Sequence, residues 1–195
     1  MLLRCLSYTC LVVALFACNS SQPGSRPGGK RTAATSDSAG KKATPLAANY
    51  FVERTDYFSD TRRPDRFRLE LQGGPLLDSK VRFTIQDPDG QLIHEETFRA
   101  TDLLSYAALD DTSAAGKEAF IRQRLDSFFA PSQFLRPAVK PGEQLQGDEE
   151  RQPDWDEIRS DPSATGFSYL LGEEDGRRIA WSKKRKKVVL YYNCC

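Results

Sequence analysis

Two adjacent cysteines, Cys194 and Cys195, end the chain in the stretch YYNCC and are its first candidates for chemistry. Neighbouring Cα atoms lie about 3.8 Å apart, below the separation of about 4.4–6.8 Å that disulfides usually span. A bridge between them would be strained, and redox catalysis normally uses a CxxC pair at the start of a helix. Four states stay open: a vicinal disulfide, a disulfide to another chain, a metal-bound pair or free thiols. We favour a structural or crosslinking role.

The single histidine, His94, is the other candidate, and it stands beside Glu95 and Glu96 in a predicted strand. A histidine–carboxylate base needs a nucleophile within reach, and no serine or cysteine motif marks one in this sequence. Two cysteines and one distant histidine also lack the spacing of a zinc site. We therefore expect His94 to be a surface strand residue, and we predict no catalytic residue and no metal ligand set.

Charge is strongly segregated near the end of the chain. Residues 142–176 carry eleven acids and two arginines, whereas residues 177–195 carry seven basic residues and no acid. The acidic segment could fold over the basic one, in exposed pairs worth about 0–1 kcal/mol each. Lysines at a hairpin tip could instead discourage edge-to-edge association. A third interpretation is a docking loop for phosphate or an acidic partner, formed by Lys183, Lys184, Arg185, Lys186 and Lys187.

The first residues have the layout of a secretory signal, with Arg4 followed by a short apolar run from Leu11 to Ala17. That run is far shorter than the roughly 20 residues of a membrane-spanning helix. A plain secreted signal is the alternative, but Leu15 poorly suits a small-x-small cleavage site. Leu15-Phe16-Ala17-Cys18 instead resembles the lipobox of bacterial lipoproteins.

That resemblance implies cleavage before Cys18, a covalent diacylglyceryl and acyl lipid on Cys18, and no other cofactor. By similarity to enterobacterial sorting, Asn19 implies the outer membrane. No acidic cluster of the kind that tags some lipoproteins for surface export follows Cys18, which favours the periplasmic face. Residues 18–48, a lipidated cysteine with a Ser-, Gly- and Pro-rich stretch, form a predicted disordered tether. Cys5 and Cys10 leave with the signal, so only the terminal pair remains as thiols in an oxidising compartment.

Residues 49–195 are predicted to form one α+β domain with a mostly antiparallel sheet. Alternating apolar and polar residues predict two three-stranded meanders separated by a helical insert. The predicted strands cover 65–72, 80–86 and 91–99, then 166–172, 177–182 and 187–193. A helix is expected over 113–129 and irregular chain over 131–166, which holds five prolines.

The stretches FIRQRLDSFF and VVLYYNCC make this part resemble small lipoproteins of the Bacteroidota, which imply no particular activity. Its basic, strand-rich end is also similar to membrane-bound lysozyme inhibitors, although their Ser-Gly-rich inhibitory motif is not evident. Removing Arg4 leaves 27 basic and 27 acidic side chains, and a neutral exported chain is not expected to bind nucleic acid.

Two hypotheses follow for the function. The first is a lipid-anchored, non-enzymatic interaction domain of the cell envelope, whose partner is an envelope protein or anionic lipid. The second is a thiol–disulfide or metal-handling envelope protein that uses Cys194 and Cys195.

Overall fold

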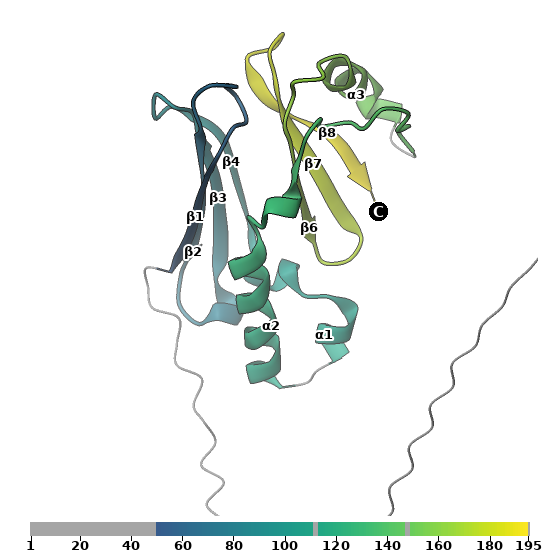
Figure 1. The fold of residues 1–195 in the computed structure, drawn as a ribbon. Coiled ribbons are helices and arrows are strands. Elements are labelled where there is room, and N and C mark those ends of the chain that lie inside the picture. Colours follow the sequence, from purple (N-terminus) through teal and green to yellow (C-terminus); the bar gives the residue numbers. More distant parts are fainter. Residues whose placement is uncertain (1–49, 111–112, 147–148, 195) are drawn as a thin grey trace, which may run out of the picture. The chain divides into compact units, whose positions relative to one another are not determined.

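The computed structural model describes residues 50–110, 113–146 and 149–194 (Figure 1). The predicted signal at 1–17, the tether at 18–48 with Cys18, and Cys195 lie outside these residues. Two four-stranded antiparallel sheets make up most of the described chain. The strands of the first sheet follow the order β1-β2-β3-β4, with bounds Phe51–Asp56, Asp65–Gln72, Lys80–Gln86 and Leu92–Arg99.

The first sheet has one apolar and one charged face, because side chains alternate along each strand. In β2, Phe67 and Leu69 are buried while Arg66 and Arg68 lie on the other face. Across the pair, Leu69 stands opposite Phe83 of β3, so both strands turn the same apolar face to the core. A short 3-10 helix, η1 (Leu76–Asp78), connects these two strands.

Helices follow the first sheet: η2 (Ala100–Leu103), α1 (Tyr106–Asp110) and α2 (Ala114–Ser127). The side chain of Ser113 caps α2 by accepting a hydrogen bond from the backbone N–H of Gly116, at 3.1 Å. Ile121 and Leu125 are one turn apart and fully buried. The predicted helix at 113–129 is therefore confirmed, and its apolar side packs into the core, as expected.

The second sheet has the order β5-β6-β7-β8 and lies beside the first in Figure 1. Helical segments precede and follow the short first strand of this sheet. The last three strands are joined to one another by two hairpin turns. The bounds are η3 Pro131–Gln133, β5 Phe134–Leu135, η4 Glu149–Arg151, α3 Gln152–Arg159, β6 Gly166–Leu171, β7 Asp175–Ser182 and β8 Lys187–Cys194.

An aromatic cluster fills the space between the two sheets. Phe67 and Phe83 of the first sheet contact Phe167 of β6, with ring centroids 5.4 and 5.6 Å apart. Phe128 and Phe129, just after α2, pack against the same ring. Each fully buried side chain of this size contributes about 1.5–3 kcal/mol of hydrophobic stabilisation, so this interface holds the sheets together.

A second, smaller core lies on the other face of β7 and β8, under α3. Trp155 and Ile158 of α3 are buried there against Ala180, Val189 and Tyr191. The second sheet is thus covered on both faces, by the first sheet and α2 on one side and by α3 on the other. Among the described residues, no helix is long and apolar enough to cross a membrane.

The predicted α+β class is confirmed, but the prediction of two three-stranded meanders is wrong, since each sheet has a fourth strand. β1 is an edge strand that buries only Asp56 fully, so its alternation is faint. β5 has two residues, too few to show a period. The region expected to be irregular also contains α3, which begins beside Pro153, a residue that suits the first turn of a helix.

Candidate functional site

Cys194 is the last described residue, and it lies in β8 opposite Gly176 of β7. Its thiol is free and half-buried. Burial first, and then a hydrogen bond with this thiol, raise the pKa of Tyr192 on the same strand. Cys195 and Cys18 lie outside the described residues, so the disulfide or thiol pair and the lipidation site stay predictions. Within the described ranges, no three histidine, cysteine or acidic side chains are grouped to hold a metal ion.

The basic turn is defined as residues 183–187, of which 183–186 join β7 to β8 and Lys187 is the first residue of β8. The predicted hairpin is confirmed. Two of its cations fold back onto α3 and the loop that follows. Arg185 pairs with Asp154 and, at 3.4 Å, with Glu157, while the Lys183 ammonium lies 2.7 Å from Asp161. The acidic segment therefore does fold over part of the basic one.

The other three cations of the basic turn point to solvent. Lys184, Lys186 and Lys187 are exposed, and none has an ion pair among the residues that the structure describes. The candidate docking loop is thus divided into two cations that hold the turn and three that remain available.

His94 is not the surface strand residue that its acidic neighbours suggested. It lies on the inner side of β4, with 17% of its side chain exposed, and its ring contacts Phe83 at 5.1 Å between centroids. Burial lowers the pKa of His94 below its usual value, while the nearby Glu96 carboxylate, 4.0 Å from Nε2, opposes that shift. The strand alternation, which places His94 and Glu96 on the same face, could have shown this.

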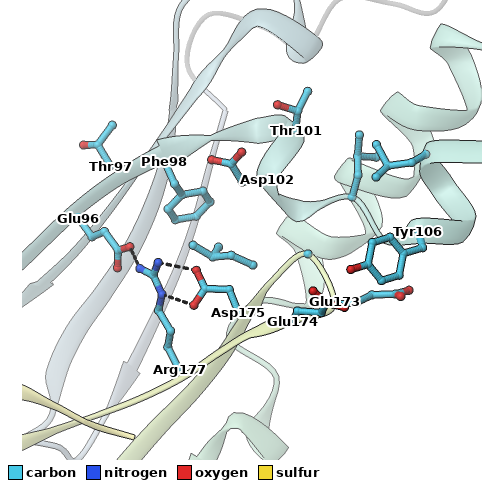
Figure 2. Close-up of a pocket in the computed structure, with 14 residues that line it drawn as sticks. Glu96, Thr97, Phe98, Thr101, Asp102, Tyr106, Glu173, Glu174, Asp175 and Arg177 are labelled. Carbon is cyan, nitrogen blue, oxygen red and sulfur yellow. Dashed lines mark hydrogen bonds and ion pairs between the residues drawn. The ribbon is translucent and has the colours of Figure 1, made fainter. Parts of the chain in front are cut away.

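A polar network links the two sheets beside His94, and Figure 2 shows three of its members, Glu96, Asp175 and Arg177. Glu96 of β4 accepts a hydrogen bond from the hydroxyl of Tyr169 on β6, at 2.7 Å, and pairs with Arg177 of β7. The guanidinium of Arg177 also binds Asp175. Its hydrogen bond with Asp175 and the charge of Glu96 raise the pKa of Arg177, against the effect of burial. Burial and Glu96 raise the pKa of Tyr169.

The network forms one wall of an open pocket of about 630 Å³, within the range of about 300–1,000 Å³ typical of ligand sites. One side comes from β4, η2 and α1, and the other from the turn between β6 and β7. The lining residues are Glu96, Thr97, Phe98, Thr101, Asp102, Leu104, Tyr106, Leu109, Leu171, Gly172, Glu173, Glu174, Asp175 and Arg177.

The mouth of the pocket combines acidic and apolar groups. Tyr106 and Leu109 of α1 are 54% and 50% exposed, so they offer apolar surface to a ligand at this edge of the pocket. Glu173 and Glu174 lie next to Tyr106 in Figure 2 and have no ion pair with any lysine or arginine in the described part of the chain. The Tyr106 hydroxyl donates a hydrogen bond to Glu174, which raises the pKa of Tyr106.

Comparison with protein-family models, with curated proteins and with solved structures finds no match. The pocket itself could not be found by reading along the chain, because its two sides come from residues 96–109 and 171–177. The run Glu173-Glu174-Asp175 is visible in the sequence, but an acidic run before a glycine is also typical of a hairpin turn.

Proposed function

We propose that this chain is a lipid-anchored protein of the cell envelope whose folded part binds a ligand in the open pocket. The lipid on Cys18 would hold it on the periplasmic side of the outer membrane, and the Leu15–Cys18 stretch supports that anchor. Two acyl chains or more hold a protein far more firmly than one, so such an anchor is stable. The pocket supports binding, because it is open, partly apolar and of the size of ligand sites.

The ligand is a peptide that presents a lysine or arginine next to an apolar side chain. Glu173 and Glu174 carry negative charge that no described cation neutralises, and this observation carries the proposal. Arg177 does not neutralise them, since Glu96 and Asp175 already occupy its guanidinium. The exposed ring of Tyr106 offers a face for a cation, an interaction worth about 0.5–1 kcal/mol at exposed sites.

The test is a binding measurement with short synthetic peptides that contain Lys-Phe or Arg-Phe, and with matched peptides that contain Glu-Phe. The cationic peptides should bind and the acidic ones should not. Replacing Glu173 and Glu174 together with glutamine should weaken binding about tenfold or more, equivalent to about 1.4 kcal/mol. The matched control is Glu149→Gln with Glu150→Gln, an adjacent exposed pair on η4. Equal losses in both double variants, or no preference for the cationic peptides, would count against the proposal.

The alternative function is thiol–disulfide or metal handling by Cys194 and Cys195. One observation favours it: the free thiol of Cys194 interacts with the phenol of Tyr192 at the end of β8. Its test is the replacement of both cysteines with serine, which should abolish redox behaviour or metal binding if this function is correct.

A further inference from the structure

We propose that the basic turn docks the protein onto an anionic phospholipid surface, through Lys184, Lys186 and Lys187. This inference is separate from the ligand pocket. It depends on the proposed anchor at Cys18 in one respect, because the lipid would keep the turn close to a membrane. Each lysine near an anionic surface raises the binding constant for that surface about fivefold, so three lysines together raise it on the order of a hundredfold.

The turn is held rigidly, which favours docking because little further ordering is required. The hydroxyl of Ser182 accepts a hydrogen bond from the backbone N–H of Arg185, at 2.9 Å. The backbone carbonyl of Ser182 accepts another from Lys186, at 2.8 Å. Ser182 is itself fully buried and donates its hydroxyl to Glu157 of α3. The pairs of Arg185 and Lys183 with α3 and its following loop fix the same turn from the side.

The local charge points to an anionic partner. The turn has five cations, and the carboxylates that contact it are Asp154, Glu157 and Asp161. Five cations against three carboxylates leave an excess of two positive charges, and the cations that make no ion pair among the described residues are the three exposed lysines. Lysine is a strongly hydrated point charge on a flexible stem, which suits a fluid layer of phosphates better than a shaped pocket.

The experiment places the full chain, extracted from membranes of expressing cells, in vesicles of phosphatidylcholine alone or of phosphatidylcholine with phosphatidylglycerol. Acylation of each lysine by an amine-reactive ester is then followed by mass spectrometry. Lys184, Lys186 and Lys187 should react more slowly on the phosphatidylglycerol vesicles, and added salt should abolish the difference. Lys80, Lys117 and Lys140, which lie elsewhere in the described chain, serve as internal references.

Two charge-reversed proteins complete the test. In these proteins the readout is deuterium exchange, because the glutamate protein lacks the lysines whose acylation is measured above. In the native chain, phosphatidylglycerol vesicles should protect the backbone amides of the turn from exchange. Replacing Lys184, Lys186 and Lys187 with glutamate should abolish that protection. The same replacement at Lys80, Lys117 and Lys140 changes the net charge equally and should leave the response intact.

Equal reactivity of the turn lysines on both vesicle types would overturn the proposal, as would equal protection by dissolved inorganic phosphate. Failure of the chain to insert into neutral vesicles would count against the anchor at Cys18 and not against the turn. The turn would then be assayed by co-sedimentation with phosphatidylglycerol vesicles at low salt. The glutamate variant should bind at least about a hundredfold more weakly, because it loses three positive charges and gains three negative ones.

Discussion

Glu96 of β4 and Arg177 of β7 form an ion pair that joins the two sheets of the fold. Both side chains are largely removed from solvent, with 20% and 25% of their surfaces exposed. Tyr169 binds the same carboxylate from β6, so one residue of the first sheet holds two strands of the second. The pair also forms a wall of the pocket, which ties the integrity of the sheet interface to the shape of the candidate site.

Replacing Glu96 with glutamine should lower the free energy of unfolding by about 1–3 kcal/mol, because hydrogen bonds to a charged group are lost in a half-buried setting. Denaturation by urea measures this change. The control is Glu95→Gln, since Glu95 is the next residue of β4 and pairs with Arg82 on the exposed face. That variant should leave the free energy of unfolding almost unchanged, because an exposed ion pair stabilises a protein very little. Similar costs for the two variants would contradict a structural role for the Glu96–Arg177 pair.

Stability should fall as the pH drops below about 6.5, the usual pKa of an unfolded histidine. Burial lowers the pKa of His94 in the folded protein, so the unfolded chain takes up the proton at higher pH than the folded one. The unfolded state is therefore favoured as the pH falls from that value toward the folded pKa. Urea denaturation between about pH 5 and 7 measures the slope.

The control for this dependence of stability on pH is His94→Gln, which removes the only imidazole of the chain. Asp65, whose pKa burial raises, is present in both proteins, so their difference isolates His94. An unchanged slope in His94→Gln would show that the histidine does not control stability in this pH range.

A close contact at Gly166 predicts a coupled effect in the smaller core. A methyl group at this residue would lie 2.5 Å from the hydroxyl oxygen of Tyr191 and 3.2 Å from the Cα of Ala138. That hydroxyl donates a buried hydrogen bond to the carbonyl of Ala138, at 2.7 Å. Gly166→Ala should therefore destabilise the protein by about 1–3 kcal/mol, through overpacking and through displacement of Tyr191.

A double-mutant cycle measures that coupling by denaturation. In a Tyr191→Phe background the hydroxyl is gone, so Gly166→Ala should cost less than it does in the native chain. Part of its cost should remain, because Ala138 is still close. Strict additivity of the two changes would contradict the contact.

The anchor predicts a processing defect. A Cys18→Ala protein should keep its first 17 residues and incorporate no labelled palmitate, because the acylated sulfur is absent. Labelling followed by electrophoresis and N-terminal sequencing measures both effects. Cys5→Ala should be processed normally, and continued labelling of the Cys18→Ala protein would rule out this anchor.

The terminal cysteines distinguish the two functional hypotheses. Replacing Cys194 and Cys195 with serine should leave binding of cationic peptides unchanged, since Cys194 is not among the residues that line the pocket. Mass spectrometry of the C-terminal peptide without reductant identifies the bonding state in the native chain. A loss of redox behaviour or metal content in the double serine variant would instead support the thiol function.

Much of the fold could be predicted from local patterns, and the reasons for the failures are physical. Strands such as β2 and β3 alternate strongly because one face is buried, and α2 has a cap and an apolar side. In contrast, α3 is short and follows a proline-rich, acidic stretch, so Trp155 and Ile158 were not recognised as its buried side.

The candidate site was harder to predict because its geometry depends on distant pairings. The partners of Arg185 and Lys183 could be anticipated from opposite charge, but not the division of the basic turn into bound and exposed cations. The Glu96–Arg177 pair joins residues 81 positions apart, and nothing in the neighbourhood of either one indicates the other.

The order of strands in the two sheets has a consequence for how the chain reaches this structure. Each of the eight described strands pairs only with the preceding or the following strand of the chain. Every pair except β5–β6, which residues 136–165 separate, is a local hairpin, so both sheets can form largely from local contacts. Contacts such as Phe67 with Phe167 instead close long loops, which is entropically costly and slow. We expect the sheets to form first and the aromatic interface to close last. Substitution of Phe167 by leucine should then accelerate unfolding more than it slows folding, which stopped-flow kinetics would measure.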